Sequence, residues 1–242
     1  MALRYINFSG NLSFSGTVAV DDGDSPGGGG DWWDADALVD IDFVNDRAWT
    51  ASDGEVQIDT LVGSDPIVSS AYGTSTYDPE ALSADGYTMQ GDHLAFIGGA
   101  KTLLLGGATI RVEFKRVAAS GSSAFYQYGA DDASAALALD VDWNNAEVEL
   151  YSWLGTYNKN ITGVLGSDGS INAFAMTATS SRSEVSVNGS AADVESLSTD
   201  DWPASGYDVV FINLEAPSIL RRIKIFDPLA DATGLPALST VS

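Results

Sequence analysis

The stretch Ser183-Glu184-Val185-Ser186-Val187-Asn188-Gly189-Ser190 alternates apolar with polar residues and then reaches an Asn-Gly pair. Alternation with a period of two is typical of a strand with one buried face, and Asn-Gly supplies the positive φ angles of a tight hairpin turn. Similar β-branched and aromatic runs recur between Gly, Ser, Thr and Asp. They predict eight strands, at 103–105, 109–114, 124–128, 135–141, 147–153, 171–179, 184–187 and 207–214. No window of about 12 residues carries a sustained helical apolar face, so the chain is predicted to be an all-β sandwich.

The first 30 residues are predicted to be separate from this sandwich. Leu3–Val20 has the pattern of a β arm, and the Asp21–Asp31 stretch that follows contains Pro26 and four consecutive glycines, which cannot hold a strand. We therefore predict an N-terminal β arm and Gly-rich connector at 1–30 and a sandwich domain at 31–242. The large apolar residues of the arm predict contacts with a partner, and the interface candidates there are Tyr5, Phe8 and Phe14.

The beginning of the sandwich domain carries a second strand pattern. Val39–Val44 alternates strictly, which places Val39, Ile41 and Phe43 on one face and predicts a half-buried strand. The segment 45–91 is loop-rich, with one helical turn expected near 59–62. Trp32 and Trp33 lie just before the strand, and because adjacent side chains in a strand point to opposite sides, one indole is expected to be an interface anchor.

Composition excludes several classes of function. The chain has 242 residues with 11 Lys and Arg against 34 Asp and Glu, a formal charge of −23, so it repels phosphate backbones and is not expected to bind nucleic acid. With no Cys and one His it offers no disulfide, thiolate or zinc chemistry. No export signal and no apolar stretch of membrane-spanning length is found, so membrane insertion is not expected. The acidity is read as a solvated surface, with adaptation to high salt or divalent cations as the alternative.

The strand at 147–153 carries the candidate binding residues. Its alternation directs Val148 and Leu150 inward and Glu147, Glu149, Tyr151 and Trp153 to the opposite face. Carboxylates beside aromatic rings suit a sugar, and Glu149, Tyr151 and Trp153 are the predicted glycan-binding residues. A water-facing strand and a catalytic pair are the alternatives, and the expected common solvent environment of Glu147 and Glu149 argues against catalysis, which needs carboxyls with different pKa values.

No cofactor is expected, although one alternative involves a metal. Asp21, Asp22, Asp24 and Asp31 supply oxygen atoms of the kind that Ca²⁺ takes, but the stretch departs from an EF-hand loop, and solvation of the connector is the simpler reading. We therefore predict no metal site and no catalytic residue.

The closing part of the chain resembles a known family. The Asn188-Gly189 hairpin, the core strand at 207–214 and the final Ile219-Leu220-Arg221-Arg222-Ile223-Lys224-Ile225-Phe226 strand are similar in order and pattern to the second half of the concanavalin-A-like (laminin-G-like) jelly roll. Thr109–Phe114 resembles that family's early core strand. The resemblance implies a jelly-roll β-sandwich of the lectin type.

A second resemblance covers Leu38–Leu105. Asp40-Ile41-Asp42-Phe43 through Trp49, then Ser69–Tyr77, then Leu94–Ile97 and Thr102–Leu105, is similar to the lead-in of tailed-phage virion proteins that end in this sandwich. It implies a non-enzymatic virion protein, a decoration, head-fibre or tail-fibre subunit assembled in the host cytoplasm. Its expected partners are other virion proteins, further copies of itself, with a trimer favoured, and a host-surface polysaccharide. The alternative is a bacterial polysaccharide-binding or polysaccharide-cleaving module.

Overall fold

The computed structural model places every strand that it describes within one compact unit, Ala35–Ser242. The described residues are 32–51, 54–56, 68–69, 82–89, 93–96, 98–117, 122–129, 137–142, 145–152, 158–180, 182–196, 208–212 and 218–241. The predicted arm, its connector and the helical turn expected near 59–62 lie outside these residues.

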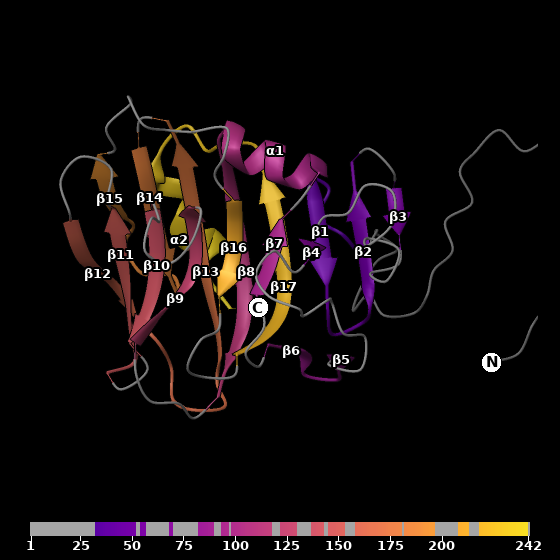
Figure 1. Ribbon diagram of the computed structural model, residues 1–242, viewed down its shortest axis with the longest axis horizontal. Helices are drawn as coiled ribbons and strands as arrows, with labels where there is room; N and C mark the ends of the chain where they lie inside the picture. Colours follow the sequence, from indigo (N-terminus) through magenta and orange to yellow (C-terminus); the bar gives the residue numbers. More distant parts are fainter. Residues whose placement is uncertain are drawn as a thin grey trace, which may run out of the picture. The chain divides into compact units, whose positions relative to one another are not determined.

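Sheet A is the larger of the two described sheets and contains the first and the last described strand of the sandwich domain. Its strands are β1 Val39–Asp42, β2 Arg47–Thr50, β3 Gly54–Val56, β5 Leu82–Ser83, β6 Gly86–Met89, β8 Ala108–Arg116, β13 Ile171–Thr179, β14 Arg182–Val187, β15 Asp193–Ser196 and β17 Ser218–Phe226. Their order is β15-β14-β13-β8-β17-β1-β2-β3, with β6 pairing to β17 and β5 pairing to β6. Strands far apart in the chain, such as β1 and β17, are therefore neighbours (Figure 1).

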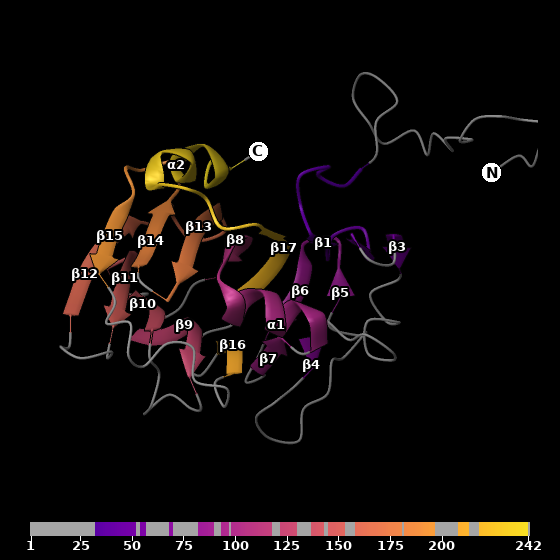
Figure 2. The ribbon, with the colours of Figure 1, turned by 90° about the horizontal axis from the view of Figure 1, so that it is seen from above.

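Sheet B is the second layer. It consists of β4 Val68–Ser69, β7 His93–Phe96, β9 Ser122–Gly129, β10 Leu137–Asp142, β11 Glu147–Ser152, β12 Asn158–Val164 and β16 Asp208–Ile212, in the order β12-β11-β10-β9-β16-β7-β4. Figure 2 shows the two sheets face to face, with the short helix α2, Leu235–Leu238, on the side of sheet A that faces away from sheet B. The predicted all-β sandwich is confirmed.

The core lies between the sheets and follows strand alternation. In β8 the side chains of Ile110, Val112 and Phe114 are at most 1% exposed, and in β13 Phe174 packs its ring 5.8 Å from that of Tyr126 in β9. The hydroxyl of Tyr126 donates to that of Tyr128 at 3.2 Å, both side chains being fully buried. Burial raises the pKa of both tyrosines, so they stay neutral in the core.

The Asn-Gly turn forms as predicted. Asn188 and Gly189 have φ angles of 49° and 75°, and the amide of Ser190 donates to the carbonyl of Val187 at 2.9 Å. The predicted strand 171–179 matches β13 residue for residue. Strands β2, β3, β4, β5, β6, β12 and β15 are not among the predicted strands, because each is short or carries few large apolar residues.

The strand predicted at 103–105 is wrong, because these residues belong to helix α1, Gly98–Gly106. Ala100 and Leu104, one helical turn apart, are 4% and 0% exposed and pack into the core, so a three-residue apolar run serves one face of a helix. Gly107, at φ +102°, then ends the helix by donating its amide to the carbonyl of Leu104. The helix contacts β8 and β16 at one end of the sandwich (Figure 1).

The half-buried strand predicted for Val39–Val44 is also corrected. All four residues of β1 are buried, with Asp40 at 0% and Asp42 at 5% exposure. Asp42 accepts hydrogen bonds from the amides of Val44 and Asn45 in the turn that follows and from the side chain of Arg47. Carboxylates that were expected to face water are instead buried with their partners.

Candidate functional site

The predicted glycan-binding strand forms as β11, in the outer half of sheet B. Val148 and Leu150 are 3% and 0% exposed, as their inward assignment requires. Glu149 lies between them and is only 4% exposed. The structure gives the backbone of Tyr151 within this strand, while Trp153 lies outside the described residues.

Glu147 and Glu149 do not share one solvent environment, contrary to expectation. Glu147 at the start of β11 is half-buried, whereas Glu149 is closed to solvent. The register between β11 and β12 also shifts between Val148 and Glu149. Glu147 therefore pairs with Val164, whereas Glu149, two residues later, pairs with Ile161, three residues earlier in β12. Simple alternation treats both positions as equivalent and cannot predict this difference.

Sheet B concentrates acidic positions around β11. The register places Asp140 of β10 opposite Glu149, and Asp142 opposite Glu147. Residues directly opposite in an antiparallel pair share one face of the sheet, so these four acidic positions lie on the same face. Lys159 of β12 stands opposite Tyr151 and is the one Lys or Arg of the described strands of sheet B.

Sheet A holds most of the cations of the chain, and each of them has an acidic partner. Eight of the 11 Lys and Arg residues lie in β2, β8, β14 and β17. Their pairs are Arg47–Asp42, Arg111–Glu113, Lys115–Asp85, Arg116–Asp168, Arg182–Glu184, Arg221–Glu113, Arg222–Asp40 and Lys224–Asp40, at 2.7 to 3.8 Å. The eight pairs involve eight of the 11 cations but only six of the 34 acidic residues. The other 3 cations and 28 acidic residues are outside this set of pairs.

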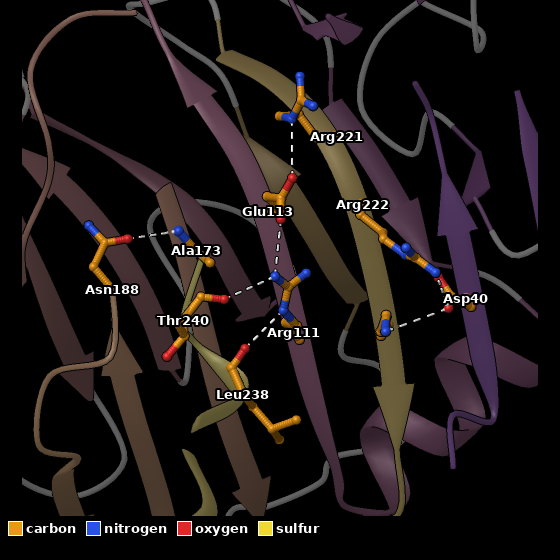
Figure 3. A network of polar contacts seen from close by, with 10 residues as sticks. Asp40, Arg111, Glu113, Ala173, Asn188, Arg221, Arg222, Leu238 and Thr240 are labelled. Atoms are coloured by element: carbon orange, nitrogen blue, oxygen red, sulfur yellow. Dashed lines mark hydrogen bonds and ion pairs between the residues drawn. The ribbon is translucent and has the colours of Figure 1, made fainter. Parts of the chain in front are cut away.

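Asp40 is the most deeply buried acceptor of this set. Arg222 reaches it with two hydrogen bonds, of 2.8 and 2.7 Å (Figure 3). The amine of Lys224 lies 3.8 Å from the same carboxylate. Burial lowers the pKa of Arg222, but the hydrogen bonds and charge of Asp40 more than offset this, so the pKa is raised overall and the cation is retained. Breaking a buried pair of this kind costs about 3 to 5 kcal/mol.

Arg111 links the same sheet to the C-terminal segment. Its side chain donates to Glu113 at 3.0 Å and to the carbonyls of Leu238 and Thr240 at 2.8 and 3.3 Å (Figure 3). Arg221 holds the other oxygen of Glu113 at 3.1 Å. A buried carboxylate thus fixes the guanidinium that binds the end of the chain.

The C-terminal segment covers part of the outer face of sheet A. Ser239 shares a 2.8 Å hydrogen bond with Ser186 and accepts from the amide of Gly189 at 2.9 Å. The short helix α2 contacts β13 and β14 (Figure 2), where the small outward residues Ala173 and Ala175 are fully buried. This part of sheet A is therefore occupied by the chain itself.

The interface candidates are only partly located. Trp32 and Trp33 lie in a bend rather than a strand, and their rings meet edge to face at 5.9 Å and 87°. The expectation that they diverge to opposite sides is wrong, because it assumed strand geometry. Tyr5, Phe8, Phe14 and the acidic residues of the connector lie outside the described residues.

Two further classes of site were sought within the described residues. No group of three or more His, Asp or Glu there is placed to hold a metal ion. No helix there has the length and apolar character to cross a membrane. Asp21, Asp22, Asp24 and Asp31 lie outside the described residues, so the Ca²⁺ site considered for them stays a prediction.

Comparison with known proteins places the fold. Domain 4 of the GH43 extracellular arabinanase of Geobacillus stearothermophilus, solved with arabinotriose, is similar over 84% of this chain and 98% of its own, with a TM-score of 0.55 and 10% identity. The fold is a concanavalin-A-like jelly roll. The sialidase CBM40 of Ruminococcus gnavus bound to α2,3-sialyllactose matches 56% of this chain and 83% of its own, with a TM-score of 0.43 and 14% identity. An alginate lyase of Pseudomonas aeruginosa is similar over 56% of this chain and 73% of its own, with a TM-score of 0.44 and 12% identity. No family model and no curated protein matches the sequence.

Proposed function

We propose that this chain is a glycan-binding module that adheres to a polysaccharide without cleaving it. The observation that carries the proposal is the jelly roll itself, which extends over almost the whole of an arabinanase domain solved with arabinotriose. The aromatic and acidic residues of β11 and its continuation supply the chemistry that a sugar needs. Ring faces stack on the C–H groups of a pyranose or furanose, and carboxylates accept hydrogen bonds from its hydroxyls.

Tyr151 and Trp153 are the proposed contacts with the sugar, and Glu149 is a buried residue of the same strand as Tyr151. At 4% exposure, the Glu149 carboxylate is not open to a glycosidic oxygen at the surface. Hydrolysis requires one carboxyl group to protonate that oxygen and a second to act on the sugar. A buried Glu149 is not placed to donate that proton, and binding needs no proton donor.

We further propose that the module serves a phage-like virion as a decoration, head-fibre or tail-fibre subunit. The likeness of Leu38–Leu105 to virion lead-in segments supports this setting, and trimeric assembly through the arm at 1–30 would give avidity without new contacts to the glycan. A bacterial polysaccharide-binding module is about equally well supported, because the similar arabinanase domain comes from a bacterial extracellular enzyme and was solved with arabinotriose. Mass spectrometry of purified particles from the source distinguishes the settings: many copies per particle support the virion, and absence from particles supports the bacterial module.

The binding proposal is tested by affinity electrophoresis of the full chain through gels that contain single polysaccharides, together with an assay for released reducing ends. We expect retardation without release. Trp153→Ala should weaken binding by about 1 to 3 kcal/mol, as for loss of an aromatic anchor, while Trp153→Phe should retain most of it. Release of reducing ends that Glu149→Gln abolishes would make the chain an enzyme and refute the proposal.

A further inference from the structure

Asn188-Gly189 is the one Asn-Gly pair of the chain, and it forms the turn between β14 and β15. Asn-Gly is the pair most prone to spontaneous deamidation, because glycine has no side chain to keep the asparagine amide away from the next backbone nitrogen. Both residues have positive φ angles, and both are exposed to solvent. Water can therefore reach this turn, and the rate of deamidation depends on how firmly the fold holds the reacting atoms.

Deamidation joins the backbone nitrogen of Gly189 to the side-chain carbonyl carbon, Cγ, of Asn188. The nitrogen gives up its proton and attacks Cγ, which closes a succinimide ring. The bond from Cγ to Nδ2 breaks, and Nδ2 takes up a proton and leaves as ammonia. Water then opens the ring at one of its two carbonyls, which gives aspartate or isoaspartate. The reaction needs only water as a co-reactant.

Three hydrogen bonds hold the side-chain amide of Asn188. Its Oδ1 accepts from the backbone amide of Ala173 at 2.9 Å (Figure 3). Its Nδ2 donates to Oδ1 of Asn172 at 2.9 Å and to the carbonyl of Val164 at 3.1 Å. Because Cγ has to move to bonding distance of the Gly189 nitrogen, ring closure strains or breaks these hydrogen bonds. Asn172 is fully buried, so water does not readily take the place of Asn188 there.

The attacking nitrogen is held by the C-terminal segment. The amide of Gly189 donates to Oγ of Ser239 at 2.9 Å, and Ser239 is fully buried. Arg111 binds the carbonyls on both sides of that serine, those of Leu238 and Thr240, at 2.8 and 3.3 Å (Figure 3). The Gly189 nitrogen has to give up its hydrogen bond before it can lose its proton and approach Cγ. Release of the C-terminal segment therefore frees the nucleophile.

From these contacts we infer that Asn188 is a deamidation site that the docked C-terminal segment protects. When the segment lifts from sheet A, the turn reacts, and the loss of ammonia makes the change irreversible. The product has a carboxylate oxygen in place of the Nδ2 donor, and this oxygen faces two acceptors, Asn172 Oδ1 and the carbonyl of Val164. Val164 ends β12 of sheet B, whereas Asn188 follows β14 of sheet A, so the modification loosens a contact between the two sheets.

The test follows Asn188 by peptide mapping and mass spectrometry while the full chain ages in mildly alkaline buffer, with isoaspartate identified by electron-transfer fragmentation. Folded wild-type chain should react at least about tenfold more slowly at Asn188 than chain unfolded in guanidinium chloride. Ser239→Ala removes the acceptor of the Gly189 amide and should raise the rate in folded chain about fivefold. Hydrogen exchange of the Gly189 amide, measured by NMR, should accelerate in parallel.

The matched control is Thr233→Ala, which removes a hydroxyl hydrogen bond to Asp231 within the same segment and should leave the rate unchanged. Equal rates in folded and unfolded chain, or no effect of Ser239→Ala, would show that the segment does not protect the site. Equal acceleration by Thr233→Ala would assign the effect to general loosening and overturn the role of Ser239.

The structural effect of the modification is measured separately. Asn188→Asp carries the aspartate product from the start and should lower the midpoint of thermal melting by about 2 to 4 °C, as for loss of one hydrogen bond. An unchanged midpoint would show that the modification does not loosen the sheets.

Discussion

Replacing Asp40 with Asn tests whether the buried ion pairs hold sheet A together. The substitution keeps the shape of the side chain and one oxygen acceptor but removes the charge that Arg222 and Lys224 share at 2.7 and 3.8 Å. Loss of one partner of a buried pair costs about 3 to 5 kcal/mol. Because Arg222 keeps 26% side-chain exposure, water partly compensates it, and we expect the lower end, about 3 kcal/mol.

Urea unfolding and thermal melting followed by tryptophan fluorescence and circular dichroism measure this loss. For a domain of this size, about 3 kcal/mol lowers the midpoint of melting by about 6 to 12 °C. The matched control is Asp85→Asn, which breaks the 2.7 Å pair of Lys115 with a carboxylate that is 52% exposed on the same sheet, and should leave the midpoint almost unchanged. A double-mutant cycle with Arg222→Gln should give a coupling energy of at least about 1 kcal/mol.

Two outcomes would refute this reasoning. Asp40→Asn could melt within about 2 °C of the wild type, which would mean that the pair contributes less than about 1 kcal/mol. Alternatively, Asp85→Asn could destabilise as much as Asp40→Asn, which would mean that burial does not set the cost. In either case the network would not determine how β1 joins β17.

Three further predictions concern the core, the C-terminal segment and the surface. Tyr126 and Tyr128 have raised pKa values, so an alkaline absorbance titration should show these two tyrosines ionising above the ordinary pKa of about 10; their contribution to stability is full below about pH 10 and is lost as pH rises through the folded pKa values. Leu235→Ala, at a side chain with 0% exposure under the C-terminal segment, should cost about 3 kcal/mol in urea unfolding, whereas Ala237→Ser at an exposed position should cost almost nothing. The hydrogen bond from Lys115 lowers the pKa of Asp85 below its ordinary 3.8, and an NMR titration should show that pKa return toward 3.8 in Lys115→Gln.

The sequence predicts the strands best where one face is apolar and the pattern is long. The nine residues of β13 alternate through Phe174 and Met176, and the turn at Asn188-Gly189 is encoded in two adjacent residues, so both could be predicted locally. The run at Leu103 is too short for its period to distinguish a strand from a helix, and only the contact of α1 with β8 and β16 decides it.

The candidate site could be predicted only to the level of a strand. Alternation correctly directs Val148 and Leu150 inward, but it carries no information on what lies over the opposite face, and Glu149 is therefore more buried than its pattern indicates. The register shift in β12 beside it involves a partner strand with little apolar character. Burial of a polar position is a tertiary property, set by neighbours that the local sequence does not contain.

The alternation of Val39-Asp40-Ile41-Asp42 shows why the same pattern has opposite meanings in the two sheets. An acid every second residue normally marks a face open to water. In β1 the guanidinium that neutralises Asp40 comes from Arg222, 182 residues later in the chain, and it is delivered by β17 as the adjacent strand. In β10 and β11 the register instead sets acid opposite acid. Arg222 and Lys224 of the closing strand thus neutralise Asp40 in sheet A, whereas in sheet B the same alternation places acidic positions of two neighbouring strands opposite one another.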